Sequence, residues 1–256
     1  MKLIASDYDG TLKIGKLVSE EDKLALKAWK AAGNLDVIDT GRSMESFQME
    51  AKKNGLTFDY YITNNGGMVY DKQLNCIFAS YLPIEVGLEI MKGVKDKEGV
   101  FSYVANDGFY RHRIIINEQL EEHRYPDLAP NISEEELFSL GKYAQLVISF
   151  ESMELAKAAE GVYRAKYGEF IEAYANKYVV DIVPKGISKA TGLKLVCDQE
   201  KIKIEDVYTI GDADNDIDLI QFGINGGVMS IAQESVKAYA KREYTCVSAL
   251  IKEILK

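Results

Sequence analysis

Two aspartates separated by one residue, Asp7 and Asp9, are the residues near the start of the chain whose types and spacing suit catalysis. They follow a mainly apolar run, residues 2–6, which predicts a buried parallel strand. Residues i and i+2 of a strand point the same way, so both carboxylates should face one site while Tyr8 points elsewhere. Two such charges in a desolvated cleft require a cation beside them, either a metal ion or a cluster of Lys and Arg. The pair is typical of a nucleophile and an acid/base, although an ordinary Asp-Gly turn also fits the motif.

A second group of carboxylates follows another predicted strand, residues 207–210. The turn there is Gly211-Asp212-Ala213-Asp214-Asn215-Asp216. Because the carboxyl ends of parallel strands meet at one edge of a sheet, we expect a convergent set of four carboxylates, namely Asp7, Asp9, Asp212 and Asp216. Ligand sets made only of oxygen suit Mg²⁺. Such a turn alone is more often a helix cap, and its combination with the first motif favours a metal site.

Lys189 stands in the first turn of a predicted helix that Ser188 opens. The helix macrodipole disfavours a cation at this end, so the position indicates a functional role. The alternative is a surface lysine whose stem lies along the protein while its ammonium reaches water.

The other predicted strands also end in groups suited to phosphate. Residues 35–39 run into Thr40-Gly41-Arg42, and residues 60–63 run into the stretch 64–67, which is Asn-Asn-Gly-Gly. Gly10 lets the chain turn sharply and lets its amide approach an anion. A hydroxyl, glycine amides, a guanidinium and an amide side chain are thus expected at one edge. The basic run of residues 111–113 in the middle of the chain is interpreted as a solvated strand face rather than a specificity pocket.

The order of the predicted elements defines the fold class. Strands alternate with helices in residues 1–82 and again in residues 185–256, where the last strand is expected near residues 244–247, and this order predicts an α/β fold, a doubly wound parallel sheet. Residues 83–184 instead contain paired strands with hairpin signals, one at Asn106-Asp107-Gly108, and a capping box that starts at Ser133. We interpret them as an inserted α+β domain, with hinges at Pro83 and Pro184.

Composition narrows the partners and the chemistry. The 256 residues carry a formal net charge of −9, which argues against nucleic acid or an anionic membrane as the main partner. No apolar run approaches the ~20 residues of a membrane span, and no signal-peptide pattern precedes the first strand, so a cytoplasmic protein is expected. The 3 cysteines lack metal-ligand spacing, and 2 histidines leave little material for a zinc site or a histidine triad.

Taken in order, these motifs resemble the haloacid dehalogenase superfamily of phosphatases, in particular its Cof-type members with a large inserted α/β cap. The resemblance covers the whole chain and depends on Asp7-Tyr8-Asp9-Gly10-Thr11, Thr40-Gly41-Arg42, Asn65-Gly66-Gly67, Lys189 and the turn from Gly211 to Asp216. One departure is visible. After the last core strand the family usually has a Met-Gly-Asn-Ala-like stretch, and this chain has Met229-Ser230-Ile231-Ala232.

The resemblance implies a role for each residue. Asp7 would be the nucleophile and Asp9 the general acid/base. Mg²⁺ would be held by Asp7, Asp212 and the carbonyl of Asp9, and Asp216 would support the metal ligands. The residues expected at the phosphate are Gly10, Thr11, Thr40, Gly41, Arg42, Lys189 and Asn215.

The expected function is hydrolysis of small phosphorylated metabolites, sugar phosphates first, through an aspartyl-phosphate, with the cap selecting the leaving group. Two alternatives stay open: a phosphomutase or phosphotransferase with the same chemistry, and a non-catalytic phospho-acceptor or metal-binding module. The protein is expected to be a monomer or a weak homo-oligomer.

Overall fold

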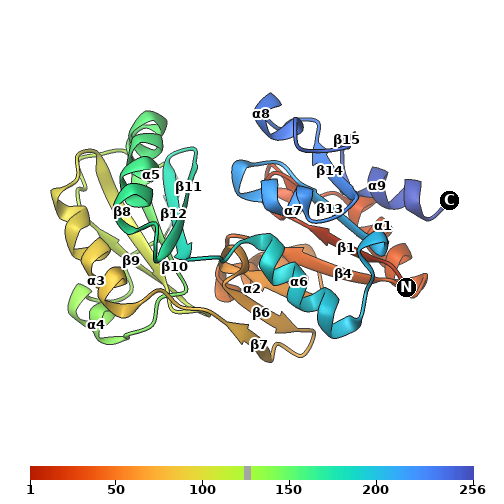
Figure 1. The fold of residues 1–256 in the computed structure, drawn as a ribbon, viewed down its shortest axis with the longest axis horizontal. Coiled ribbons are helices and arrows are strands. Elements are labelled where there is room, and N and C mark those ends of the chain that lie inside the picture. Colours follow the sequence, from red (N-terminus) through yellow and green to blue (C-terminus); the bar gives the residue numbers. More distant parts are fainter. Residues whose placement is uncertain (124–127) are drawn as a thin grey trace. The chain divides into compact units, whose positions relative to one another are not determined.

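The computed structural model describes residues 1–123 and 128–256, which form two compact units (Figure 1). The first unit comprises Met1–Arg42, Phe47–Phe78 and Ser188–Lys256, and the second comprises Ser43–Ser46 and Ala79–Ile187. The chain therefore passes between the units at residues 42–43, 46–47, 78–79 and 187–188, and the expected domain boundaries at residues 83 and 184 stay a prediction. Within the described ranges, no helix has both the length and the apolar character needed to span a membrane.

The first unit is built on an eight-stranded sheet in the order β15-β14-β13-β1-β4-β5-β6-β7. The pairs from β15 to β5 are parallel, and β6 runs antiparallel to β5. This sheet confirms the predicted α/β class. Its strands are β1 (Leu3–Ser6), β4 (Leu35–Asp39), β5 (Tyr60–Thr63), β6 (Met68–Asp71), β7 (Cys76–Ala79), β13 (Val207–Gly211), β14 (Asn225–Met229) and β15 (Arg242–Tyr244). A separate small hairpin joins β2 (Lys13–Ile14) to β3 (Leu17–Val18).

Helices cover both faces of this sheet. Neighbouring residues of a strand point to opposite sides, so a single strand contacts helices on both faces. In β5, Ile62 lies against Gly192 of α6, whereas the adjacent Tyr61 packs on Phe47 of α2. The buried strands read as near-continuous apolar runs, as two covered faces require. The helices are α1 (Glu20–Ala31), α2 (Met44–Asn54), α6 (Lys189–Glu200), α7 (Ile217–Gln221), α8 (Glu234–Lys237) and α9 (Val247–Ile254), with short 3₁₀ turns at Asn64–Gly66, Ile204–Asp206 and Asp214–Asp216.

The C-terminal end differs from the sequence-based expectation. A last strand was expected at residues 244–247, but β15 ends at Tyr244 and Val247 begins α9. The buried side chains of α9 are Val247, Ser248, Leu250 and Ile251, and the Ser248 amide donates to Asp22 of α1 at 2.7 Å. A short apolar run fits a strand or a buried helix equally well, so periodicity alone favoured the wrong element here.

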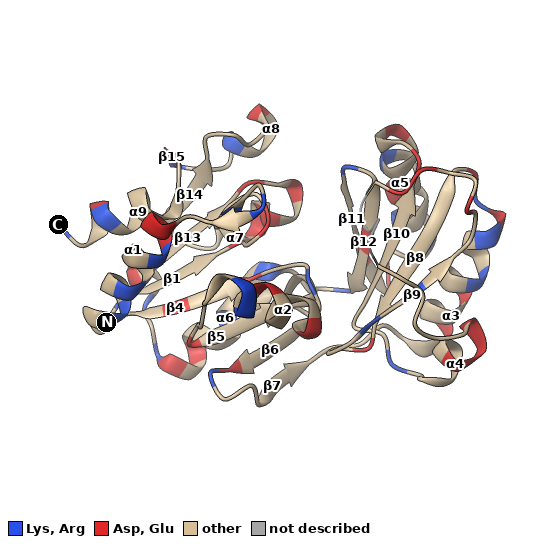
Figure 2. Ribbon diagram, turned by 180° about the vertical axis from the view of Figure 1, so that it is seen from behind, with Lys and Arg blue, Asp and Glu red and all other residues tan. Residues whose placement is uncertain are grey.

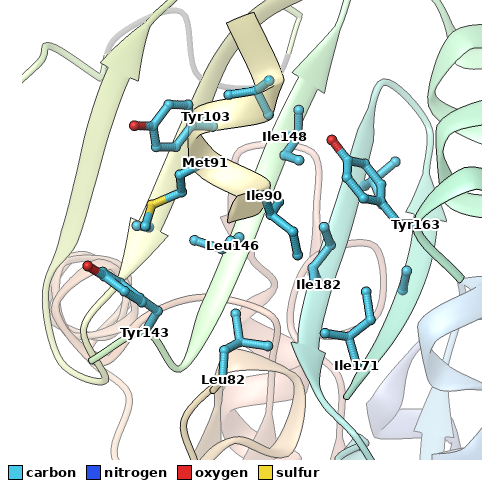
Figure 3. Packing of buried hydrophobic residues seen from close by; sticks show 14 of the residues in the cluster. Leu82, Ile90, Met91, Tyr103, Tyr143, Leu146, Ile148, Tyr163, Ile171 and Ile182 are labelled. Carbon is cyan, nitrogen blue, oxygen red and sulfur yellow. The ribbon is translucent and has the colours of Figure 1, made fainter. Parts of the chain in front are cut away.

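The second unit has a five-stranded antiparallel sheet in the order β11-β12-β10-β8-β9. Its side chains alternate between two faces, and one face buries a large cluster that includes Ile90, Tyr103, Leu146, Tyr163 and Ile182 (Figure 3). The strands are β8 (Val100–Asn106), β9 (Arg111–Ile115), β10 (Gln145–Phe150), β11 (Ile171–Asn176) and β12 (Val179–Pro184); the helices are α3 (Ile84–Gly93), α4 (Glu134–Ser139) and α5 (Met153–Tyr167), with a 3₁₀ turn at Val94–Asp96. The predicted hairpin after Asn106 and the capping box at Ser133 are both confirmed.

Arg113 corrects one expectation. The run 111–113 was interpreted as a solvated strand face, yet Arg113 is only 3 % exposed. Its guanidinium pairs with Glu122 at 2.6 Å and lies over the Phe101 ring. In β9, Arg113 stands opposite Val104, a buried residue, and this register directs the side chain into the unit.

Candidate active site

The carboxyl ends of three parallel strands bring the site together. Ser6 of β1 is in register with Ile38 of β4 and Ile210 of β13. The next residue of each strand, namely Asp7, Asp39 and Gly211, therefore lies at the same level of the sheet edge. The Asp7 amide continues the ladder by donating to the Ile210 carbonyl at 2.9 Å.

Lys189 is the cation beside Asp7. Its ammonium lies 2.6 Å from Asp7 Oδ1 and 2.5 Å from Asp216 Oδ1, and its side chain is fully buried. Burial alone would lower the pKa of Lys189, but the charges of Asp216, Asp7 and Asp39 together raise it. The lysine is therefore a fixed positive charge rather than a surface residue.

A glycine contact explains how a helix N-terminus delivers Lys189 to this place. Gly66 has φ +98°, and a Cβ there would stand 2.0 Å from the Ser188 carbonyl oxygen and 3.1 Å from the Lys189 nitrogen. Gly192, one turn further along α6, also fits closely, since a Cβ there would stand 2.6 Å from Ile62 Cγ2. The Asn65-Gly66-Gly67 stretch thus matters for packing, because it lets the loop after β5 touch the start of α6.

The Asp-rich turn after β13 is held by its own hydrogen bonds. Asp216 Oδ2 accepts from the amides of Asp212 and Ala213, each at 3.0 Å, while Oδ1 faces Lys189. Thr11 donates to Asp212 Oδ1 at 2.7 Å. Gly10 has φ +98°, and a Cβ there would meet the Asp212 carboxylate at 2.3 Å. Gly10 and Thr11, expected at the phosphate, therefore both contact Asp212.

Asp9 has a cation of its own. The Arg42 guanidinium donates two hydrogen bonds to the Asp9 carboxylate, from Nε to Oδ2 at 2.5 Å and from Nη2 to Oδ1 at 2.8 Å. The two aspartates of the first motif thus pair with different cations, Asp7 with Lys189 and Asp9 with Arg42. Between them Tyr8 points into the unit as expected, and its side chain is fully buried.

The remaining predicted residues lie in the loops after β4 and β13. The Thr40 hydroxyl is buried and accepts from the Arg42 amide at 3.2 Å. Asn215 donates to Asn65 Oδ1 at 2.9 Å. Gly41 lies directly beside that amide group, since a Cβ there would stand 3.0 Å from Asn65 Oδ1. Asn65 Nδ2 is buried without a hydrogen-bond partner, so it is available to an oxygen of a ligand.

Asp39 belongs to the site and was missed from the sequence. It is fully buried, both carboxylate oxygens lack a hydrogen-bond partner, and burial raises its pKa well above the ordinary range. No motif in the sequence marks Asp39, and only the register of β4 against β1 places it at the level of Asp7.

The carboxylates suit a hard divalent cation. In the part of the chain that the structure describes, Asp7, Asp212 and Asp216 offer oxygen atoms that all lie within 4.8 Å of one another. Burial, Asp216 and Asp212 raise the pKa of Asp7, and Lys189 only partly offsets them. Four acidic groups around one lysine leave an excess of negative charge that a second cation would neutralise, so the donor set fits Mg²⁺. Since Asp216 already accepts from Lys189 and two amides, Asp7 and Asp212 are the better ligands.

Charge elsewhere is mixed: Figure 2 shows Lys and Arg next to Asp and Glu along helices such as α3 and α5. The concentrated charge of the site comes instead from loops at the strand ends.

A parallel α/β sheet with an aspartate pair, a buried lysine and an Asp-rich turn at its carboxyl edge defines a class of hydrolase. The chain belongs to the haloacid dehalogenase-like hydrolases, whose family model matches residues 4–248. This protein is accordingly a hydrolase of that family.

Named relatives and solved structures are similar to this chain over nearly its whole length. A 5-amino-6-(5-phospho-D-ribitylamino)uracil phosphatase of Bacillus subtilis is 27% identical over 249 residues, 94% of this chain and 90% of that protein. A sugar phosphatase of subclass IIB is 25% identical with a TM-score of 0.82, covering 99% of each chain. A HAD/COF-like hydrolase of Plasmodium vivax superposes with a TM-score of 0.85 over 100% of this chain and 95% of that one; at 22% identity it shows the shared fold alone.

Proposed function

We propose that this hydrolase is a phosphatase of small phosphorylated metabolites, which acts with the help of Mg²⁺ and through an aspartyl-phosphate on Asp7. The observation that carries the proposal is the buried Asp7 with Lys189 at 2.6 Å, directly beside Asp212 and Asp216. A carboxylate placed next to a fixed cation is a nucleophile that an anionic phosphate can approach.

Each residue has one task in the proposed reaction. An Asp7 oxygen forms a bond to phosphorus as the bond to the ester oxygen breaks, and Asp9 supplies the proton for that leaving oxygen. In the second half, Asp9 takes a proton from the water that attacks the phosphorus of the aspartyl-phosphate, and the bond between phosphorus and the Asp7 oxygen breaks to release phosphate and restore the carboxylate. Lys189 faces the phosphoryl oxygens, and Thr40, Asn65 and Asn215 line the same edge.

The ion would be held by the carboxylates of Asp7 and Asp212 and by the carbonyl of Asp9. Asp216 would support the turn that carries Asp212. When bound, Mg²⁺ supplies positive charge that draws the phosphate toward the carboxylates. Thr11 and Gly10 act here through Asp212, which they hold in place from the opposite loop.

Sugar phosphates are the proposed substrate class. The support is that one similar structure is a sugar phosphatase and that the relative from Bacillus subtilis is a 5-amino-6-(5-phospho-D-ribitylamino)uracil phosphatase. Selectivity is assigned to residues 83–184, the proposed cap.

The test compares Asp7→Asn with Asp9→Asn. Asp7→Asn should lose at least ~10³-fold of phosphate release, because an amide is a poor nucleophile of nearly the same shape. Asp9→Asn should still accept phosphate from an aryl phosphate, whose leaving group needs no proton, and then accumulate phosphoenzyme. Acid-quenched mass spectrometry of the labelled protein locates the phosphoryl group. Wild-type-like phosphate release from Asp7→Asn would refute the assignment, and transfer of phosphate to added sugar instead of water would identify a phosphomutase.

A further inference from the structure

The contacts of Asp9 extend beyond the reacting groups. Arg42 reaches it from the loop after β4 with two parallel N–H donors, and Lys13 Nζ stands 4.0 Å from Asp9 Oδ1 on the other side. A forked arginine contact fixes the plane of a carboxylate, which a single ammonium contact cannot do. The orientation of Asp9 is therefore set by Arg42.

Helix α2 supports this arrangement from behind. Glu50 accepts from Lys13 at 2.7 Å and from the Tyr8 hydroxyl at 3.0 Å. Asn54, one turn further along the helix, donates to the same hydroxyl at 3.2 Å. Because Tyr8 stands between Asp7 and Asp9 in the chain, Glu50 fixes the backbone that carries both aspartates.

The Tyr8 ring joins the two cations. The Arg42 guanidinium carbon and the Lys13 ammonium each lie 5.6 Å from the ring centroid. The ring is fully buried and packs edge-on against Phe47 of α2 at 5.2 Å. Both cations thus rest on a rigid aromatic surface, and neither has to lose much further freedom when it holds Asp9.

We infer that Arg42 is a positioning residue, which orients the Asp9 carboxylate for proton transfer in both halves of the reaction, and that Lys13, Glu50 and Tyr8 brace it. The inference builds on the proposed function, because it concerns the acid/base of that site. It also differs from the expectation that Arg42 binds phosphate, because the Nε and Nη2 donors of Arg42 are directed to Asp9.

The experiment uses Arg42→Lys in the full chain, because lysine keeps the charge and loses the fork. With an aryl phosphate, the first turnover should release the phenol at nearly the wild-type rate, and hydrolysis of the phosphoenzyme should then slow by about 10- to 100-fold. The ratio kcat/KM for the aryl phosphate should stay within about threefold, since it reflects binding and formation of the phosphoenzyme, while kcat and KM should fall together as hydrolysis becomes the slow step. With an alkyl phosphate, whose leaving oxygen needs a proton, formation of the phosphoenzyme should slow as well.

A double-mutant cycle separates positioning from phosphate binding. If Arg42 acts through Asp9, Arg42→Lys should cause no further loss in the Asp9→Asn background. Additive losses, or a tenfold rise in KM with no phosphoenzyme accumulating, would overturn the inference and make Arg42 a phosphate ligand. Arg242→Lys is the matched control, because Arg242 is exposed and pairs with Glu253, away from Asp9.

Two further readings keep the test decisive. Glu50→Gln should reproduce a weaker form of the Arg42→Lys behaviour, so a fold defect in one variant does not stop the test; normal kinetics in both variants would refute the inference. If instead the wild-type protein forms no phosphoenzyme, the proposed function itself fails, which the Asp7→Asn and Asp9→Asn comparison shows separately.

Discussion

Asp36 shows how one buried carboxyl makes stability depend on pH. It lies fully buried in β4, accepts from the Asp59 amide at 3.0 Å and from Lys30 at 3.1 Å, and has one oxygen without a partner. Burial raises the pKa of Asp36 from 3.8 to about 7, despite the opposing charge of Lys30. A raised acid pKa means that this contribution to stability is fully present below pH ~4 and is lost as the pH rises through ~7.

We expect Asp36→Asn to remove that dependence. Asparagine keeps the acceptor for the Asp59 amide and cannot ionise. The free energy of unfolding of the variant, relative to that of the wild type, should therefore increase from pH 5 to pH 8. The whole pKa difference corresponds to about 4 kcal/mol, of which the range from pH 5 to pH 8 covers at most about 3 kcal/mol. Urea unfolding at several pH values measures it. Asp198→Asn, at an exposed helix position, is the control and should follow wild type. Parallel curves for Asp36→Asn and wild type would contradict the expectation.

At the scale of elements, the contact between the loop after β5 and the start of α6 decides where Lys189 lies. The macrodipole disfavours a lysine in the first turn of a helix, so packing and the carboxylates have to hold it there. Gly66 permits the approach and Asp7 and Asp216 supply the charge. Lys189 at the start of α6 and the glycine-rich loop after β5 therefore depend on each other, because the close contact at Gly66 places the lysine beside its carboxylates.

Gly66→Ala tests this contact. The new methyl group would stand 2.0 Å from the Ser188 carbonyl oxygen, so α6 has to shift. We expect a loss of about 3 kcal/mol in unfolding free energy together with loss of phosphatase activity. Gly33→Ala is the matched control, because Gly33 also has a positive φ, +77°, but a Cβ there meets nothing within 4 Å. It should lose only about 1 kcal/mol and keep activity. Equal effects in both variants would assign the whole loss to backbone strain.

At the scale of the whole molecule, the proposed ion links loops that are far apart in sequence. Asp7 and Asp212 are brought together by the pairing of β1 with β13, so an ion between them stabilises the folded sheet and not the unfolded chain.

Mg²⁺ should therefore raise the melting temperature of the unit that contains the eight-stranded sheet. The rise should grow with the logarithm of the Mg²⁺ concentration. Asp212→Asn should abolish most of this rise, whereas Asp218→Asn, at an exposed position of α7, should keep it. Ca²⁺, which takes about 6–8 oxygens at longer distances, should compete for the site and inhibit turnover. Differential scanning fluorimetry with a chelator as reference measures the shift. A full shift in Asp212→Asn would move the ion away from these carboxylates.

The sequence alone determined the elements that carry the chemistry. The strands 35–39 and 60–63 were predicted with the bounds that β4 and β5 have. Their patterns are local, because a buried strand or an amphipathic helix with a serine cap can be recognised from a few consecutive residues. The motif residues at the strand ends followed from the same local information.

The tertiary structure decided which partner each residue has. Sequence spacing predicted a cation near the first aspartate pair but left open whether one cation serves both, and the fold gives Lys189 to Asp7 and Arg42 to Asp9. Asp39 carries no motif and becomes part of the site only because β4 lies in register with β1. Such pairings depend on long-range register and on close contacts at glycine, which no stretch of sequence contains by itself.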